Sequence, residues 1–100
     1  MRISMRKMTT MLELEITTKY RKDRKRMKKR GVDLSLLRDI IRKLQNQEPL
    51  EAKHNDHPLK GNYVGFRECH ITPDWLLIYA IDNGRLVLTA SRTGSHSDLF

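Results

Sequence analysis

The sequence has little cysteine, few aromatic residues and no long apolar run, and these shortages exclude several classes of protein. A single cysteine, Cys69, allows no intramolecular disulfide, which favours a reducing compartment. No segment approaches the length of a transmembrane helix, and residues 1–11 are too polar for a signal peptide. We therefore expect a cytoplasmic protein with no membrane partner.

The length of 100 residues is that of one small domain. The apolar fraction of 38% is low, but it is high enough for a modest core rather than a disordered chain. We expect a single domain over residues 1–100, with residues 1–8 as a flexible N-terminal extension.

The positive charge is concentrated in the first third of the chain. Residues 1–30 hold 12 Lys and Arg against three acidic residues, whereas the other 70 residues hold eight against nine. Such a focused field attracts a polyanion, and phosphate backbones are the commonest polyanions in a cell. Charge alone does not separate nucleic acid from an acidic protein partner, and a solvated helix face is the simpler alternative to both.

A strand and a basic helix are predicted first. Leu12, Leu14 and Ile16 alternate with Met11 and two glutamates, which is the period of a half-buried strand. A helix over residues 19–30 follows, with Thr17 or Thr18 as its cap. Its thin packing stripe consists of Tyr20, Arg24 and Met27.

A second helix is predicted from Asp33, a good N-cap, and Pro49 closes the segment. Gly31 ends the first helix, so the two helices form a hairpin. The apolar stripe of the second helix consists of Leu34, Leu37, Ile40, Ile41 and Leu44.

Three further strands are predicted over residues 63–70, 75–81 and 85–91. Asn83-Gly84 indicates a two-residue hairpin turn between the last two. Residues 75–81 are apolar on both faces and therefore form the central strand. The expected fold is α+β in the order β-α-α-β-β-β, with a two-helix hairpin packed on a four-stranded antiparallel sheet.

Histidines and one aspartate fall at the ends of these strands. His70 ends one strand and Asp74 begins the next, so antiparallel pairing predicts a contact between them. His57 precedes the sheet and His96 follows its last strand. The sheet could gather these side chains at one end.

Three imidazoles and a carboxylate near a basic surface suit cleavage of RNA by its own 2′-hydroxyl. That reaction needs a base for the 2′ proton, an acid for the leaving 5′ oxygen and a cation for the phosphate. Histidine serves as acid or base near neutral pH, and a carboxylate fixes its tautomer. Arg67 or Arg92 could bind the phosphate through paired hydrogen bonds.

Structural roles compete with each of these assignments. A lone histidine such as His54 is more often structural than catalytic, and Cys69 is expected inside the core. Trp75, Tyr79 and Phe66 are expected in the core rather than stacked on bases. A zinc site formed by His57, His70, Asp74 and His96 is chemically possible. These ligands are widely spaced, however, and there is no HExxH or paired-cysteine spacing, so we expect no metal and no cofactor.

Four linked blocks of the sequence resemble the YafQ branch of the RelE toxin superfamily. They are DHPLKG at 56–61, GFRECH at 65–70, PDWLLIY at 73–79 and RTGSHSDLF at 92–100. The blocks cover most of residues 56–100, and the predicted helix order fits the family fold over the rest. Four blocks at consistent spacing are more specific than any one histidine.

The resemblance implies an mRNA interferase, the toxin of a bacterial type II toxin–antitoxin pair, which inhibits translation. Such toxins enter the A site of the 70S ribosome and cut the mRNA there without a metal. His57, His70, Asp74 and His96 match the family's catalytic set. His96 is the expected general acid, His57 or His70 the base, and Asp74 an orienting or stabilising group.

The resemblance also implies residues that hold the substrate and the partners. Phe100 matches an aromatic substrate position, Arg67 and Arg92 are candidate phosphate ligands, and Glu68 stands where relatives often have aspartate. An acidic antitoxin would neutralise the toxin, and the pair would bind operator DNA only as a complex. The basic helix would contact ribosomal RNA through Lys19, Arg21, Lys22, Arg24, Lys25, Arg26, Lys28, Lys29 and Arg30.

Two other functions compete with this one. The chain could be a non-catalytic nucleic-acid-binding or co-repressor protein that uses its basic helix alone. It could also be a toxin on the same fold that inhibits DNA gyrase, although that branch is not expected to carry this histidine set. Growth arrest with mRNA cut inside translated codons would separate an interferase from both.

Overall fold

The computed structural model describes residues 11–100, so the extension expected over residues 1–8 lies outside the described residues. A five-stranded sheet, three α-helices and two short 3-10 helices make up this part of the chain. In chain order the elements are β1 (Glu13–Ile16), α2 (Thr18–Lys29), α3 (Leu34–Gln45), η1 (Ala52–His54), β2 (His57–Pro58), η2 (Gly61–Tyr63), β3 (Arg67–Thr72), β4 (Trp75–Asp82), β5 (Val87–Gly94) and α4 (His96–Leu99).

The sheet has the strand order β1-β5-β4-β3-β2. The α+β class is confirmed, and so is the central position of β4. The expected four-stranded antiparallel sheet is wrong in two respects: β1 runs parallel to β5, and the two-residue strand β2 adds a fifth member at the far edge. Most of the chain separates β1 from β5, so no tight turn dictates their relative direction.

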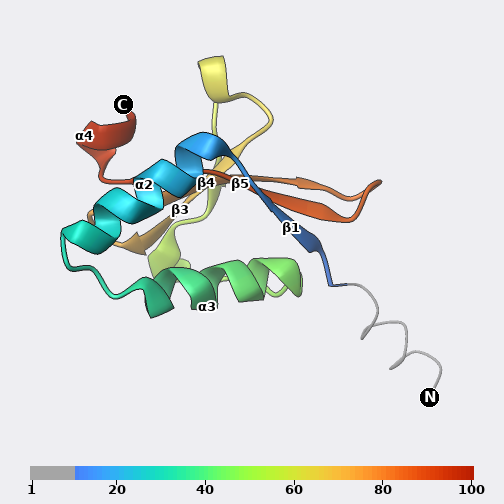
Figure 1. Ribbon diagram of the computed structural model, residues 1–100. Coiled ribbons are helices and arrows are strands. Elements are labelled where there is room, and N and C mark those ends of the chain that lie inside the picture. The colour runs from blue at the N-terminus through green and yellow to red at the C-terminus, as the bar shows by residue number, and fades with distance from the viewer. Residues whose placement is uncertain (1–10) are drawn as a thin grey trace.

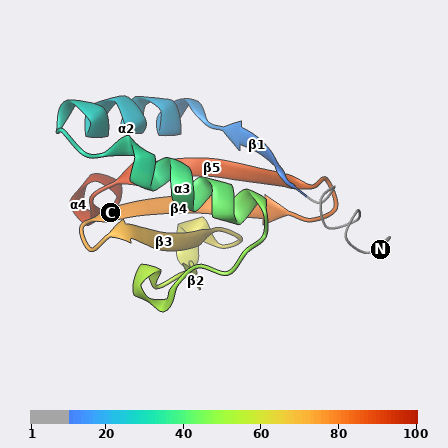
Figure 2. The same ribbon diagram turned by 90° about the horizontal axis from the view of Figure 1, so that it is seen from below.

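The two faces of the sheet carry different elements. Helix α3 lies against one face, and α4 and the segment around η2 lie on the opposite side (Figure 1). Seen from below, α2 lies beside β5 in line with β1, while α3 crosses in front of the strands (Figure 2). The face that carries α4 therefore remains free of the two long helices.

Both long helices begin at the predicted caps. The Thr17 side chain accepts a hydrogen bond from the Tyr20 amide at 3.0 Å, and the Asp33 carboxylate accepts from the Ser35 amide at the same distance. The apolar stripe of α3 is buried as predicted. The stripe of α2 differs, because Asp23 rather than Arg24 is buried between Tyr20 and Met27.

The hairpin between β4 and β5 has a four-residue loop rather than the predicted two-residue turn, since Asp82 pairs directly with Val87. The Asp82 carboxylate accepts from the amides of Gly84 and Arg85 at 3.0 and 3.2 Å. Leu86 then closes the loop with a φ of 58°. A local side-chain hydrogen bond, which favours a longer turn, thus overrides the Asn-Gly signal.

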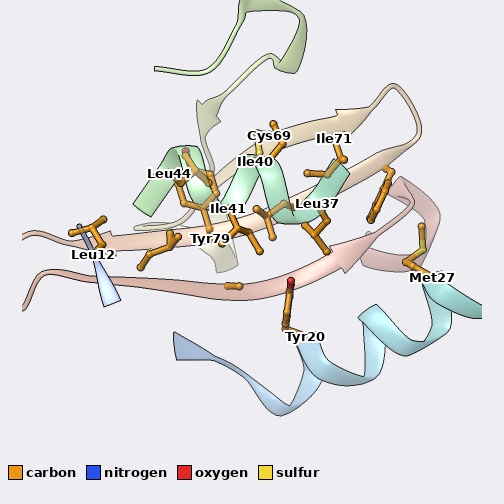
Figure 3. Packing of buried hydrophobic residues seen from close by; sticks show 14 residues of the cluster. Leu12, Tyr20, Met27, Leu37, Ile40, Ile41, Leu44, Cys69, Ile71 and Tyr79 are labelled. Carbon is orange, nitrogen blue, oxygen red and sulfur yellow. The ribbon is translucent and has the colours of Figure 1, made fainter. Parts of the chain in front are cut away.

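The main core lies between α3 and the sheet (Figure 3). Trp75 and Tyr79 of β4 belong to it, as predicted, and Cys69 is fully buried there. Burial raises the pKa of the Cys69 thiol to about 12. Phe66 is instead only partly buried and packs on a second cluster on the opposite face. Among the described residues, no helix is long and apolar enough to cross a bilayer.

A buried carboxylate joins α2 to β5. Asp23, only 2% exposed, accepts two hydrogen bonds from the Arg92 guanidinium at 2.7 and 3.1 Å and one from the Thr93 amide at 3.2 Å. Arg26 donates a further bond at 2.9 Å. The Asp23 side chain therefore satisfies the backbone amide of Thr93 at the edge of β5, beyond the residues of β5 that pair with β1.

We expect Asp23→Asn to lower the free energy of unfolding by about 3 kcal/mol, because the partly buried guanidinium of Arg92 would lose the buried carboxylate that is its ionic partner. Urea denaturation measures this change. The matched control is Glu15→Gln, which removes an exposed acid 3.4 Å from Arg85 and should cost less than about 1 kcal/mol. Equal losses in the two variants would contradict the role of Asp23.

Candidate active site

Two rows of paired residues cross the face of the sheet opposite α3. Glu68, Ile78 and Arg92 pair in one row, and His70, Leu76 and Gly94 pair in the next. Paired residues on neighbouring strands point to the same side. The polar members lie on β3 and β5, and the buried apolar residues of β4 separate them.

A carboxylate lies between two histidines at the β3 end of these rows. Strand β2 pairs His57 with Glu68 across the sheet. The Glu68 Oε2 atom is 3.1 Å from His57 Nε2 and 3.8 Å from His70 Nε2. Because His57 Nδ1 faces the Pro58 carbonyl at 3.1 Å, both ring nitrogens of His57 meet acceptors, and an imidazolium can donate to both.

His57, Glu68 and His70 are also a set of potential metal ligands. One donor atom from each lies within 4.8 Å of the other two. Two imidazole nitrogens and a carboxylate oxygen suit a borderline ion such as Zn²⁺ or Cu²⁺. The widely spaced ligands considered in the sequence did not include Glu68, although it lies two residues before His70 and so on the same face of a strand.

Asp74 does not pair with His70. It lies in the exposed turn between β3 and β4, and it makes no hydrogen bond or ion pair with any residue of the 11–100 region. The His70 Nδ1 atom instead faces the Pro73 carbonyl at 3.4 Å. The predicted contact is wrong because the register of β3 and β4 pairs His70 with Leu76 and leaves Asp74 in the turn, whereas strand alternation places Glu68 beside His70.

The second histidine group lies at the other end of the rows. Ser95 caps α4 through a reciprocal pair of hydrogen bonds with Asp98, and Leu99 anchors α4 in the second apolar cluster. His96 and Phe100 have ring centroids 5.0 Å apart, and Phe100 and Tyr63 are 5.7 Å apart. These three rings form an aromatic shelf on the site face.

Tyr63 was missed by the sequence reasoning. It falls in η2, a segment that was expected to belong partly to a strand, and its interactions with Phe100 and Arg92 relate it to the site. Its place at the start of the predicted strand over residues 63–70 gave no signal of a role in the site.

Arg92 and Arg67, the two candidate phosphate ligands, lie on opposite faces. Arg92 shares its row with Glu68, and its bonds to Asp23 raise its pKa, so it stays protonated on the site face. Arg67 pairs with Tyr79 on the α3 side, where it donates to Asp56 at 3.2 Å. The structure therefore brings only Arg92 to the site.

The basic helix α2 presents two kinds of cation. Arg26 pairs with Asp23, and Arg30 pairs with Asp98. The other seven are exposed and form no ion pair within residues 11–100. These are Lys19, Arg21, Lys22, Arg24, Lys25, Lys28 and Lys29.

The arrangement is suited to acid–base chemistry on a phosphodiester. His70 and Gly94 are two strands apart, which corresponds to about 10 Å between their Cα atoms. His96 lies just beyond Gly94, so the two histidine groups stand on either side of an apolar floor. A proton donor and a proton acceptor can thus approach one nucleotide from opposite sides, with Arg92 nearby.

Comparison with known proteins gives this site its context. Residues 12–100 match the family model described as the bacterial toxin of a type II toxin–antitoxin system, YafQ. The chain is 39% identical over 89 residues to the mRNA interferase toxin YafQ of Escherichia coli K12, which covers 88% of this chain and 95% of that one. The chain belongs to the YafQ family of type II toxins.

Solved structures agree with the fold. A metal-bound toxin from Helicobacter pylori has 47% identity and a TM-score of 0.85, over 90% of this chain and all of that one. YafQ in the E. coli DinJ–YafQ toxin–antitoxin complex has 38% identity and a TM-score of 0.81, over 90% and 98% of the two chains. The α+β fold is thus the fold of this toxin family.

We expect Glu68→Gln to slow RNA cleavage at least tenfold, because the carboxylate that both His57 and His70 face would lose its charge. The measurement is the single-turnover rate on a ribosome-bound message. Glu51→Gln serves as the matched control, since Glu51 is exposed and its one ion pair among residues 11–100 is with Lys53 at 3.7 Å. A Glu68→Gln variant as fast as this control would show that the two histidines act without the carboxylate.

Proposed function

We propose that this toxin is a ribosome-dependent mRNA endoribonuclease that cleaves mRNA in the ribosomal A site without a metal. The observation that carries the proposal is the pair of histidine groups on one face of the sheet, His57 and His70 around Glu68 on one side and His96 on the other. The E. coli relative is named an mRNA interferase, which supports the same reaction here.

The proposed reaction is attack of the 2′-hydroxyl on the adjacent phosphorus. His57 or His70 removes the 2′ proton, the P–O5′ bond breaks, and His96 protonates the leaving 5′ oxygen, which leaves a 2′,3′-cyclic phosphate. Glu68 orients the base, and Arg92 binds the phosphate oxygens. Asp74, exposed at the rim, would stabilise the bound substrate rather than orient His70.

The aromatic shelf is the proposed binding site for a nucleobase of the substrate. Phe100 is 56% exposed although it is a large apolar side chain, and the rings of Tyr63 and His96 flank it. A nucleobase stacks well on such a surface, whatever its identity. Phe100 would therefore hold the nucleotide beside the general acid His96.

Helix α2 is the proposed contact with ribosomal RNA. Its seven exposed cations without ion pairs form a dense positive surface, and each can neutralise a phosphate. The helix lies beside β5 rather than on the site face, so it can bind rRNA while the site face remains open to mRNA (Figure 2).

The proposed partner is an acidic antitoxin, and the toxin would reach operator DNA only within that complex. The E. coli relative has been solved in complex with its antitoxin DinJ. In this chain, a groove of about 360 Å³ lies between β1, α2 and α3. Leu14 and Ile16, expected to be buried, remain 42% and 41% exposed along it.

The rim of this groove favours an acidic occupant. Arg24, Arg38 and Arg42 line it together with the apolar side chains of Leu34 and Leu37. An amphipathic helix with apolar residues on one face and acidic residues on its flanks would match both the floor and the rim. We assign the groove to a segment of the antitoxin.

We expect His96→Ala to reduce mRNA cleavage by about two to four orders of magnitude, because the leaving oxygen would lose its acid. Toxicity should fall in parallel, while the melting temperature and the affinity for antitoxin stay unchanged. Primer extension on a translated message measures the cleavage.

Full activity of His96→Ala would contradict the assignment of the acid. The same assay in excess chelator tests the metal-independent part of the mechanism. Unchanged cleavage is the expected result. A loss of cleavage that zinc restores would instead indicate that a metal ion bound by His57, Glu68 and His70 takes part in the reaction.

We expect Leu14→Asp to weaken antitoxin binding at least tenfold, since a charge would enter the apolar floor of the groove next to an acidic partner. Leu36→Asp is the matched control, because Leu36 is equally exposed but lies outside the groove. Calorimetry with the purified antitoxin measures both affinities. If the control weakens binding as much, the antitoxin occupies another surface.

A further inference from the structure

The side of α2 that faces β5 and α4 carries charged residues beside the buried Met27. Asp23, Arg26 and the C-cap residue Arg30 follow one another at helical spacing, and all three form ion pairs, although the arginine side chains remain 41% and 45% exposed. Asp23 holds Arg92 and Arg26, as described above. Arg30 reaches further, to the short helix α4 that carries His96.

The contact between Arg30 and α4 is a two-point ion pair. Arg30 Nη1 donates to Asp98 Oδ2 at 2.7 Å, and Nη2 donates to Asp98 Oδ1 at 2.9 Å. Paired parallel bonds of this kind fix orientation as well as distance. The Arg30 guanidinium holds the pKa of the Asp98 carboxyl well below its usual range, so the pair persists at every physiological pH.

The same carboxylate also builds the helix that it tethers. Asp98 Oδ2 accepts from the Ser95 amide at 2.8 Å, and the Asp98 amide donates to the Ser95 hydroxyl at 3.2 Å. A four-residue helix is too short to form on its own in water. The pose of α4 therefore depends on Asp98, on Leu99 in the second apolar cluster and on whatever holds Asp98.

Gly94 shows how tightly this arrangement is set. A Cβ at Gly94 would lie 3.1 Å from both Cβ and Oδ2 of Asp98, and the φ of Gly94 is +157°. The Asp98 side chain therefore packs directly against the backbone of Gly94, the last residue of β5. A shift of Asp98 would carry His96 and Phe100 with it, since both lie within two residues of it.

We propose that Arg30 is a positioning residue for the C-terminal tail, residues 96–100, and not one of the cations that dock on the ribosome. Through Asp98 it sets where His96 and Phe100 stand relative to His57 and His70. This proposal rests on the proposed nuclease function. It separates Arg30 from its neighbour Lys29, which is exposed, carries the same charge and makes no ion pair within the described region.

The two roles differ in their kinetic signature. Loss of a docking cation weakens association with the ribosome and raises KM, while kcat is retained. Loss of a positioning residue leaves association intact and lowers kcat, because a misplaced acid reacts slowly. A displacement of about 1 Å can cost a factor of roughly ten to a hundred.

The test compares Arg30→Gln with Lys29→Gln on ribosomes that carry a defined message. We expect Arg30→Gln to lower kcat at least tenfold with little change in KM, and Lys29→Gln to raise KM with kcat retained. Arg30→Lys keeps the charge but loses the second hydrogen bond, so it should recover only part of kcat. Equal effects of Arg30→Gln and Lys29→Gln would overturn the proposal.

A double-mutant cycle tests whether Arg30 acts through Asp98. Asp98→Asn keeps an acceptor for the Ser95 amide but loses the charge. If the Arg30–Asp98 ion pair, here called the clamp, is the cause, the double variant Asp98→Asn with Arg30→Gln is no slower than the slower single variant. Multiplied losses would mean that the two residues act separately and would reject the clamp.

A readout without catalysis keeps this test apart from the nuclease proposal. Amide ¹⁵N relaxation of residues 96–100 should show a tail that loses order in Arg30→Gln and keeps it in Lys29→Gln. An ordered tail in both variants would overturn the clamp. If Arg30→Gln disorders residues 96–100 and His96→Ala is nevertheless fully active, the positioning role of Arg30 is supported and His96 is rejected as the acid.

Discussion

The buried carboxylate of Asp23 is the interaction on which the arrangement of the site depends. A charged group at 2% exposure is stable only when all its acceptor capacity is used. The guanidinium of Arg92, the Arg26 side chain and the Thr93 amide satisfy it. These bonds attach α2 to β5 beyond the end of β1, and they hold Arg92, which lies in the same row of paired residues as Glu68.

The attachment has a second consequence for the far end of α2. Once Asp23 fixes the rotation of the helix, a residue two turns later points the same way. That residue is Arg30, and it meets Asp98 of α4. One helix can thereby offer an exposed cationic side to an external polyanion and a paired, charged side to the catalytic face. In the proposed function, the basic residues of α2 and its C-cap therefore serve two purposes, contact with RNA and positioning of α4.

The residues that sequence reasoning placed correctly are those whose partners lie close in the chain. The caps Thr17 and Asp33 bond to residues three and two positions later, respectively, and β4 is recognisable from its own apolar run. Asp23 looked like an isolated acid in a basic segment, because its partners lie about 70 positions further on. The direction of β1 and the existence of β2 depend on equally distant pairings.

The site shows the same division between local and distant contacts. A pair between His70 and Asp74 seemed the simplest geometry, but the strand register places Leu76 opposite His70 and leaves Asp74 in the turn. Glu68 takes the place of that acid, and period-2 alternation within one strand contained this information. The approach of His57 to Glu68 required the short strand β2, which no local pattern marked. The separate roles of His96 and Phe100 came from the family resemblance, and the contact between their rings was not predicted.

The central claim is that this face cuts mRNA while it is on the ribosome. The most direct measurement is primer extension on one defined message, incubated with the toxin in the presence and absence of translating ribosomes. The account predicts breaks inside codons at the A site when ribosomes are present and an intact message when they are absent. Equal cleavage of the free message, or no cleavage under either condition, would contradict it.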